Sequence, residues 1–306
     1  QYQALSSSNH DTLTAAHPFE GEAVVTASGH RANIFDIHIN IGADVPAGCG
    51  DNELHSAISF ILDNDSVLPS VPAPGSDSVY GHTRLWVWAN TISTSNEALC
   101  DAIGFTRTQA YNDRLIDLPG GAPAYDDAIA RVSDNLIAAG SYEQTGILLR
   151  GFIPDPTNVH SEVSVRGNTI EPGANQTAVA IRFGPVFGPG EIQRNLITID
   201  GDIGIHASGD CTGIVTSGNC AGLPVPGDGI NDISITLNDV FGADTAILVD
   251  EYNQDAFFKS NILTGDGDPD TGDTGICSFA GINDYKANKI KGFDNDILEG
   301  SCGPSP

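Results

Sequence analysis

The chain has little of what a helical, membrane-spanning or nucleic-acid-binding protein needs. Its 306 residues contain no methionine, ten glutamates against thirty aspartates, and 13 basic residues against 40 acidic ones, for a formal charge of −27. Aspartate favours turns over helices, and so negative a protein repels a phosphate backbone, so no nucleic-acid partner is expected. No apolar run approaches the roughly 18 residues of a membrane span. With 40% hydrophobic residues, 35 glycines and 17 prolines, the composition indicates a soluble, turn-rich β protein.

Six cysteines, an even number, favour an oxidising compartment. No CxxC pair and no Cys/His cluster has zinc-ligand spacing, which argues against a structural zinc. The chain begins with Gln1, and we expect the mature form of a secreted, periplasmic or cell-surface protein whose leader has been removed. A cytosolic protein with free thiols is the alternative.

A short apolar strand that ends in Asn recurs along the chain. The segments are IFDIHIN at 34–40, ISFILDN at 58–64, LWVWAN at 85–90, ARVSDN at 130–135, VSVRGN at 163–168, EIQRN at 191–195, ISITLN at 233–238, FFKSN at 257–261 and DYKAN at 284–288. The residue three places before each Asn is apolar or aromatic in all nine segments. The long interval between Asn90 and Asn135 is expected to hold one degenerate repeat near Asn112.

A second motif, Gly or Ala followed by a branched apolar residue, lies between the Asn segments. It occurs as Ala102-Ile103, Gly146-Ile147, Ala178-Val179, Gly204-Ile205, Ala246-Ile247 and Gly275-Ile276. Repeats of this length with short strands predict a β-solenoid, in which stacked coils bury one another's apolar edges. The repeated Asn is expected at a bend, where side-chain amides pair along the stack as an internal ladder. A β-sandwich or jelly roll is the alternative, although neither needs Asn at one repeated position.

The strand–Asn–x–Ile and Gly–Ile motifs resemble the right-handed parallel β-helices of the pectin-lyase-like superfamily, over about residues 30 to 300. The resemblance implies an all-β fold with a single right-handed parallel β-helix of about ten to eleven coils. Residues 31–306 would form this helix, and residues 1–30 would form an N-terminal cap. It also implies that a polysaccharide binds on an outward strand face.

Stacked coils lie about 4.8 Å apart, so the disulfides can be paired by their places in the repeat. Cys277 and Cys302 fall at similar places on adjacent coils and are expected to close the last coil. Cys211 and Cys220 enclose a short loop. Cys49 and Cys100 then pair by elimination, and because they are counted two coils apart, their bridge must join loops.

One outward column of the predicted helix carries charged side chains. Aligning the inward residues Leu149, Ile181, Ile205 and Val249 places Arg150, Arg182, His206 and Asp250 in successive coils. Arginine could bind a uronate carboxylate, and His206 or an arginine could abstract a proton in a lyase reaction. The alternative is that outward positions of a solenoid are simply polar.

A second outward face lies two and four residues before each Asn. It carries Trp86, Trp88, Arg131, Arg166 and Lys259, with Glu191, Asp284 and Lys286. Exposed tryptophans on a strand face could stack on sugar rings. A loop that packs over them is the alternative.

Alternating aspartates at Asp266, Asp268, Asp270 and Asp273 resemble a DxDxDG calcium loop. Gly272 falls one place late, and the twelfth position is Cys277 instead of Glu. Bound Ca²⁺ would brace the loop, whereas the alternative is a solvated acidic turn.

These features favour an exported protein that binds a polysaccharide or surface glycan. The same protein could cleave it as a lyase or glycoside hydrolase, through Arg150, Arg182, His206 and Asp250. No nucleophile elbow, P-loop or HExxH motif is present. The alternative is a non-catalytic cell-surface or extracellular protein, such as an adhesin or a filament or matrix subunit, which would form homo-oligomers. The charge of −27 counts against a polyanionic ligand.

Overall fold

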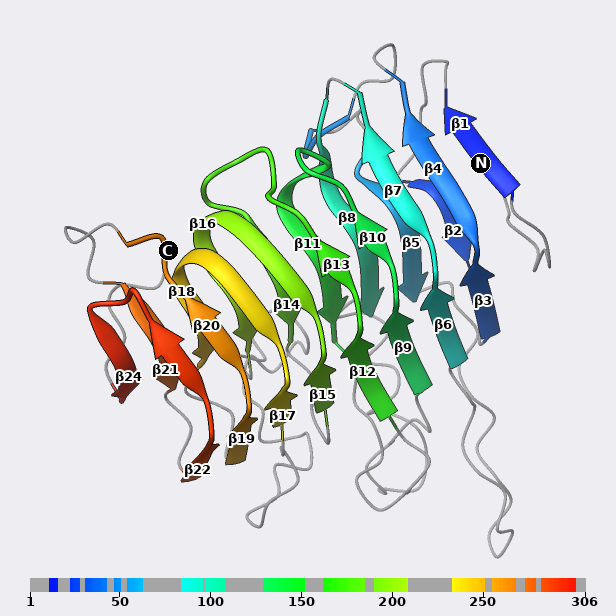
Figure 1. The fold of residues 1–306 in the computed structure, drawn as a ribbon. Coiled ribbons are helices and arrows are strands. Elements are labelled where there is room, and N and C mark those ends of the chain that lie inside the picture. The colour runs from blue at the N-terminus through cyan, green and yellow to red at the C-terminus, as the bar shows by residue number, and fades with distance from the viewer. Residues whose placement is uncertain are drawn as a thin grey trace, which may run out of the picture.

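The structure is a computed structural model, and among its described residues all regular structure is β-strand, with the strands paired in parallel. It describes residues 11–15, 23–27, 31–42, 47–50, 54–62, 84–95, 97–107, 129–151, 162–184, 190–208, 233–250, 255–267, 273–278 and 282–300. Within these ranges the strands stack along one axis, from β1–β3 at one end to β22–β24 at the other (Figure 1). No described segment forms a helix long and apolar enough to cross a membrane. The predicted all-β fold of parallel, solenoid-like sheets is confirmed.

An eight-stranded sheet forms one side of the stack. Its members are β3 (Arg31–Phe35), β6 (Arg84–Trp88), β9 (Ile129–Ser133), β12 (Glu162–Arg166), β15 (Gly190–Gln193), β17 (Ile233–Thr236), β19 (Asp255–Lys259) and β22 (Ile282–Lys286). Each strand pairs in register with the next member, so equivalent side chains line up in columns that run along the stack.

A 16-stranded sheet wraps the rest of the stack in two strips. The first strip contains β1 (Asp11–Ala15), β4 (Ile37–Ile41), β7 (Thr91–Thr94), β10 (Leu136–Ile137), β13 (Thr169–Ile170), β20 (Ile262–Thr264) and β23 (Lys289–Lys291). The second contains β2 (Ala23–Ala27), β5 (Ser56–Leu62), β8 (Leu99–Arg107), β11 (Tyr142–Arg150), β14 (Val179–Phe183), β21 (Thr274–Ser278) and β24 (Asn295–Glu299). Two long strands, β16 (Leu196–Ala207) and β18 (Asp239–Val249), run through both strips and join them.

The chain visits the eight-stranded sheet, the first strip and the second strip in turn, then enters the next coil. This order repeats from β3, β4 and β5 onward. Strands β1 and β2 extend the two strips by pairing with β4 and β5. The right-handed sense, the membership of a superfamily and the boundary at residue 30 stay predictions.

A ladder of asparagines, buried except at its partly buried last member, lies at the corner between the eight-stranded sheet and the first strip, as predicted. Its members are Asn90, Asn135, Asn168, Asn195, Asn238, Asn261 and Asn288. The Oδ1 of Asn135 accepts from the backbone N of Asn90 at 3.0 Å and from its Nδ2 at 2.9 Å. The Nδ2 of Asn135 also donates to the carbonyl of Val87 at 3.2 Å. Each amide therefore satisfies backbone groups of the preceding coil and bonds to the amides of both neighbouring coils.

The residue directly before the ladder position has a left-handed backbone in every coil. These residues are Asp36, Ala89, Asp134, Gly167, Arg194, Leu237, Ser260 and Ala287, with φ between 55° and 65°. Such a conformation costs about 1–2 kcal/mol for a residue with a side chain. The amide ladder offsets this cost, because its hydrogen bonds hold the backbone N–H of the residue that follows each left-handed position.

Two of the nine predicted Asn repeats are wrong. Phe35 pairs with Trp88, which places Ile37 at the ladder position, and the N–H of Ile37 donates to the Oδ1 of Asn90 at 3.1 Å. Asn40 is instead exposed on β4. Asn64 lies outside the described residues, but the strand before it, β5, pairs with β8 in the second strip. Buried and exposed residues alternate in the same way in the eight-stranded sheet and in both strips. The sequence pattern alone therefore could not tell which of the three a strand belongs to.

The repeat predicted near Asn112 is also wrong. The side chains of Asn90 and Asn135 bond to each other directly, so no ladder position lies between them. The predicted ten to eleven coils counted both this repeat and the one at Asn64.

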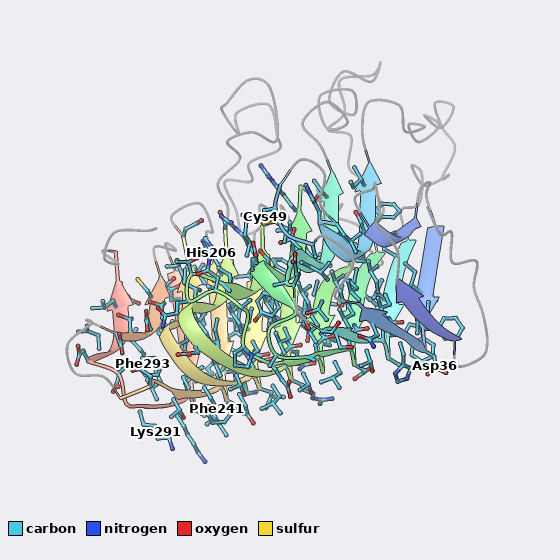
Figure 2. The ribbon with its side chains drawn as sticks, turned by 90° about the horizontal axis from the view of Figure 1, so that it is seen from above. Asp36, Cys49, His206, Phe241, Lys291 and Phe293 are labelled. Carbon is cyan, nitrogen blue, oxygen red and sulfur yellow. A yellow bond between two sulfur atoms is a disulfide. The ribbon has the colours of Figure 1, made fainter. Side chains whose placement is uncertain are left out.

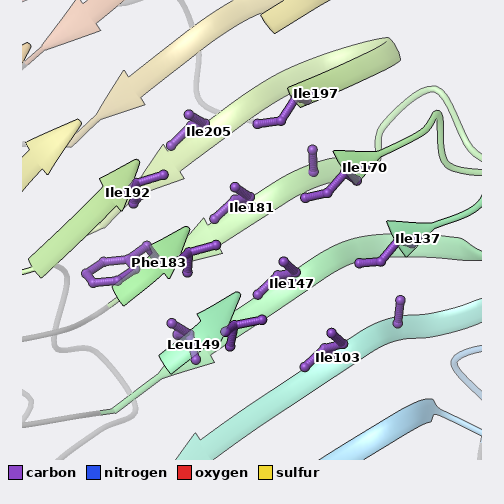
Figure 3. Close-up of a cluster of buried hydrophobic side chains, with 14 of the residues drawn as sticks. Ile103, Ile137, Ile147, Leu149, Ile170, Ile181, Phe183, Ile192, Ile197 and Ile205 are labelled. Atoms are coloured by element: carbon purple, nitrogen blue, oxygen red, sulfur yellow. The ribbon is translucent and has the colours of Figure 1, made fainter. Parts of the chain in front are cut away.

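Isoleucines stack as inward columns along the core. In the second strip Ile103, Ile147, Ile181, Ile205, Ile247 and Ile276 align in register and are fully buried. Figure 3 shows the first four of them. Burying one isoleucine side chain contributes about 1.5–3 kcal/mol, so this column is a major source of stability.

The residue before each core isoleucine is small because strands of neighbouring coils approach closely there. A Cβ added to Gly146 would lie 2.6 Å from the carbonyl oxygen of Ala180, and one added to Gly204 would lie 2.7 Å from that of Ala246. Glycine and alanine therefore alternate along this part of the column. The register corrects one predicted motif, because the equivalent pair is Ala180-Ile181 and not Ala178-Val179.

The predicted disulfide between Cys49 and Cys100 is confirmed, with Cα atoms 4.8 Å apart. The two cysteines lie on adjacent coils, because the supposed repeat at Asn64 that separated them does not exist. Cys277 is also disulfide-bonded, to a cysteine outside the described residues. Its predicted partner Cys302, and the predicted pair of Cys211 and Cys220, lie outside them too.

Candidate functional site

The four residues predicted as one catalytic column occupy two columns of the second strip. Arg182 pairs with His206, so these two are direct neighbours. Arg150 pairs with Thr106 on β8, two residues further along the strand direction. Asp250 follows Val249, which pairs with Ala207, so Asp250 also lies beyond the Arg182–His206 column.

The error in the predicted column is a shift of two residues. Leu149 pairs with Phe183 instead of Ile181, and Val249 pairs with Ala207 instead of Ile205. A shift of two preserves the alternation of inward and outward side chains, so the sequence pattern alone could not show it.

His206 and Asp250 nevertheless approach each other diagonally. The Nε2 of His206 lies 3.5 Å from the Oδ2 of Asp250, and the imidazole is almost buried. Arg182 is exposed beside it. The structure thus brings together three of the four predicted residues. His206 lies on the same side of the stack as Cys49, opposite Phe241 and Lys291 (Figure 2).

Asp101 is a functional candidate that the sequence reasoning missed. It lies on the outward side of β8, between Ser56 of β5 and Thr145 of β11. Burial raises the pKa of the Asp101 carboxyl to about 6, although a hydrogen bond from Thr145 and the positive charges of Arg182 and His55 favour the ionised form. The only sequence signal was a carboxylate within the apolar strand LCDAIGF.

A disulfide-bonded segment fixes the surroundings of Asp101. Ala47 and Leu54 form a parallel bridge, and the adjacent Cys49 is bonded to Cys100, the residue before Asp101. The N–H of Asp101 donates to the carbonyl of His55 at 2.9 Å. The ring Nε2 of His55 lies 2.6 Å from the carbonyl oxygen of Gly50. Backbone and covalent contacts therefore hold the His55 residue next to Asp101.

The outward face of the eight-stranded sheet carries the predicted sugar-binding residues. Trp86 and Trp88 are 39% and 40% exposed, the largest apolar side chains on this face. Trp88 stacks on Phe35 with ring centroids 4.8 Å apart and planes within 7°. The guanidinium of Arg131 lies 6.0 Å from the ring centroid of Trp86. We call Phe35, Trp86, Trp88, Arg131 and Arg166 the aromatic face.

The residue next to Trp88 in its column has a small side chain. Phe35 covers one side of the Trp88 ring, and Ser133 is the register partner on the other side. Arg166 is the next residue in the column, and it forms an ion pair with Glu191. Two strand spacings, about 9.6 Å, separate Trp88 from Arg166, with only a serine between them.

Lys259, the fifth predicted residue, lies on the same column but far from the tryptophans. Gln193 and Thr236 stand between it and Arg166. Three strand spacings correspond to about 14 Å. The structure thus gathers Trp86, Trp88, Arg131 and Arg166 and leaves Lys259 apart.

Three aspartates could hold a metal ion at the opposite end of the stack. Their ligand atoms, from Asp244, Asp266 and Asp273, all lie within 4.8 Å of one another, and Asp273 is buried. Carboxylate oxygens are the ligands that hard cations such as Ca²⁺ prefer. Asp266 and Asp273 were predicted, whereas Asp268 and Asp270 lie outside the described residues. Asp244 comes from β18 of the neighbouring coil, which the local loop motif could not reveal.

The chain matches no protein-family model, no curated protein and no solved structure. The function is therefore inferred from the geometry of these sites.

Proposed function

We propose that the protein is an exported glycan-binding solenoid whose binding surface is the aromatic face. The observation that carries this proposal is the order of one column, in which the small side chain of Ser133 lies between Trp88 and Arg166 and leaves a space over it. Sugar rings have apolar C–H faces that stack on tryptophan, and hydroxyl groups that accept hydrogen bonds from arginine.

The width of this space fits one sugar ring. A ring that stacks on Trp88 at van der Waals distance, about 4 Å, leaves about 5.6 Å to the Arg166 column. That remaining distance suits a hydrogen bond from a guanidinium to the ring substituents. Phe35 holds the Trp88 ring from behind, so binding costs little side-chain entropy.

The aromatic face extends the contact beyond one ring. Trp86 and Arg131 lie in the parallel column, two residues away along the strands. An extended glycan that crosses the strands would meet one side chain per coil. Arg131 adds a positive charge beside Trp86, whereas the charge of Arg166 is balanced by its ion pair with Glu191.

Titration of the protein with a panel of neutral and acidic oligosaccharides by calorimetry tests the proposal. Trp88→Ala should weaken binding at least about tenfold, because it removes the stacking surface. Ser133→Leu should weaken binding equally, because it fills the space while the aromatic rings stay. Ser234→Leu lies on the same face away from the space and is the matched control. Binding that survives Ser133→Leu would refute this site.

A second candidate function is cleavage of a glycan that binds along the second strip. The observation that favours it is the group of Arg182, His206 and Asp250, with the 3.5 Å contact between the imidazole and the carboxylate. In this version the carboxylate orients the imidazole for proton transfer, and Arg182 binds a substrate carboxylate or hydroxyl. Hydrolysis or β-elimination releases reducing ends, which can be measured across the same panel. Binding without cleavage would favour the non-catalytic surface or matrix protein.

We further propose that the ion of the Asp244–Asp266–Asp273 cluster is Ca²⁺ and that the protein works outside the cytosol. A calcium ion suits an all-carboxylate site, and its charge offsets three like charges held close together. The disulfide of Cys49 and Cys100 is compatible with an extracellular, oxidising location.

A further inference from the structure

Asn175 is an asparagine that the amide ladder does not use. It lies in the segment between β13 and β14, at the corner where the first strip leads into the second. The ladder asparagines lie at a different corner and are buried except for the last, whereas residues 174–177 are all exposed. The stacking of the coils therefore does not require an amide side chain at Asn175.

Asn175 begins a sequence that accepts N-linked glycans. Asn175, Gln176 and Thr177 form an Asn-x-Thr triplet in which x is not proline. Among the described residues no other asparagine is followed two places later by Ser or Thr. Asn64 starts an Asn-x-Ser triplet, but it lies outside the described residues. Asn175 is therefore the acceptor whose surroundings the structure describes.

The turn at Asn175 leaves its amide nitrogen available. The backbone N–H of Thr177 donates to the Oδ1 of Asn175 at 3.3 Å, and the N–H of Ala178 donates to its backbone carbonyl at 3.1 Å. Both hydrogen bonds use oxygen atoms, whereas the Nδ2 bonds to no described residue. Attachment of a glycan to the Nδ2 would therefore break no hydrogen bond within the described part of the chain.

The segment that carries Asn175 is anchored on the core, while its tip is exposed. The N–H of Ala174 donates to the carbonyl of the buried Tyr142 at 2.7 Å, and the N–H of Gly140 donates to the carbonyl of Pro172 at 2.8 Å. In the following coil β16 continues from the first strip into the second without a loop (Figure 1). That coil therefore has no loop at this corner that could cover Asn175, and a glycan there can extend into solvent.

The corner that carries Asn175 is also separate from the aromatic face. Strands β13 and β14 belong to the 16-stranded sheet, whereas Trp86 and Trp88 lie on the eight-stranded sheet. A glycan attached to Asn175 therefore leaves the proposed binding surface open.

We propose that Asn175 is an attachment site for an N-linked glycan, which the chain acquires during export. The proposal rests on the extracellular location proposed above and is independent of glycan binding at the aromatic face. In the reaction a C–N bond forms between the Nδ2 of Asn175 and the anomeric carbon of an oligosaccharide. The donor is a lipid-linked diphosphate oligosaccharide, in which the bond between the anomeric carbon and the phosphate oxygen breaks. The lipid diphosphate leaves with the bonding electrons, and the amide nitrogen releases one proton.

Peptide mass spectrometry of the protein recovered outside the cytosol of the cells that make it tests the proposal. Trypsin cleaves after Arg166 and Arg182, and the peptide 167–182 contains a single Asn-x-Thr triplet, that of Asn175. This peptide should carry the additional mass of a glycan, and its fragment ions should place the glycan on Asn175.

Variants produced through the secretory pathway of a eukaryotic cell separate recognition of the triplet from an effect on the fold. Asn175→Gln and Thr177→Ala should lose the glycan completely, although Thr177→Ala keeps the backbone N–H that closes the turn. Thr177→Ser keeps a hydroxyl group and should retain the glycan. Asn40→Gln, at an exposed asparagine followed two places later by Gly42, is the matched control and should also retain it. All four variants should be secreted at the wild-type level, because each replaced side chain is exposed.

Three outcomes would overturn the proposal. An unmodified Asn175 in the native protein recovered outside the cytosol refutes the modification and leaves the extracellular location and the binding function intact. A glycan that Thr177→Ala retains on the peptide 167–182 would mean that the triplet does not direct the attachment. Recovery of the native protein in the cytosol alone refutes both the extracellular location and the modification.

Discussion

Asn168 shows how one side chain can support three coils. Its Oδ1 accepts from the backbone N and the Nδ2 of Asn135, and its Nδ2 donates to the carbonyl of Val132 and to Asn195. The side chain is fully buried. Its removal therefore leaves polar groups of its neighbours unsatisfied in the interior, where each costs about 1–3 kcal/mol.

We expect Asn168→Ala to lower the free energy of unfolding by about 3 kcal/mol or more. Asn40→Ala should change it by less than about 0.5 kcal/mol, because Asn40 is exposed on β4 and lies outside the ladder. Urea denaturation of both variants measures the difference. Equal losses would contradict the register in which Ile37 takes the ladder position.

Asp101 should make the stability of the protein depend on pH. Its folded-state pKa of about 6 lies above the ordinary value of 3.8, so the folded state binds the proton more tightly than the unfolded state. The resulting stabilisation is complete below about pH 4 and is lost as the pH rises through about 6. The full shift corresponds to about 3 kcal/mol.

Asp101→Asn lacks this titration. Relative to the wild-type protein it should gain about 2–3 kcal/mol of stability between about pH 4 and about pH 8. Chemical denaturation at the two pH values measures the gain, and Asp200→Asn, which replaces an exposed aspartate of β16, should show none. A constant difference between Asp101→Asn and wild type would mean that the carboxyl is not buried as described.

At the scale of single elements, strand β16 shows why the second strip needs small residues at its bend. A Cβ on Gly204 would lie 2.6 Å from the Cγ1 of Val240 and 2.7 Å from a backbone oxygen of the next coil. Neither neighbour can move away, because both belong to the packed core. Gly204→Ala should therefore cost about 1–3 kcal/mol through overpacking.

Gly104 provides the comparison on β8. A Cβ there would meet two side-chain atoms, the Oγ of Ser56 at 3.3 Å and the Oδ2 of Asp101 at 3.9 Å, and the Ser56 side chain can rotate. The melting temperature of Gly104→Ala should therefore fall less than that of Gly204→Ala. The reverse order would contradict the close approach of the strands at the bend.

Strand β18 contributes to the acidic cluster, together with the segments that follow β20 and precede β21. Ca²⁺ bound by Asp244, Asp266 and Asp273 would join two neighbouring coils. Added calcium should raise the melting temperature, since a ligand of the folded state alone stabilises it by mass action, and a chelator should reverse the effect. Asp244→Asn should abolish the increase, whereas Asp200→Asn should keep it. A calcium effect that survives Asp244→Asn would place the ion elsewhere.

At the scale of the whole molecule, the sequence predicted the repeat but not its phase in every coil. Seven ladder asparagines were predictable because a buried bend recruits the same amide each time. Arg150 was misplaced because a shift of two residues within a strip leaves the alternation of buried and exposed residues unchanged. Asn40 was misplaced because Ile37, three residues earlier, takes the ladder position, and Asn40 lies past the bend on β4. The neighbours of Asp101 and Asp244 come from other coils, so no local motif could announce either site.

The net charge of −27 also acts on the molecule as a whole. Part of it follows from architecture, because every coil needs bends and aspartate favours bends. The remaining charge repels itself along the stack and destabilises the compact state, since 40 acidic residues face 13 basic ones. Salt screens this repulsion over a Debye length that falls from about 20 Å at 0.02 M to about 4 Å at 0.5 M.

We therefore expect the melting temperature to rise steadily from about 0.02 M to about 0.5 M NaCl. The increase should persist in Asp244→Asn, because it comes from the whole surface and not from the acidic cluster. It should also be the same for NaCl and KCl, since screening depends on ionic strength alone. A melting temperature that is independent of salt would mean that the acidic side chains are too far apart to repel one another, and the excess aspartate would then reflect the demands of the bends alone.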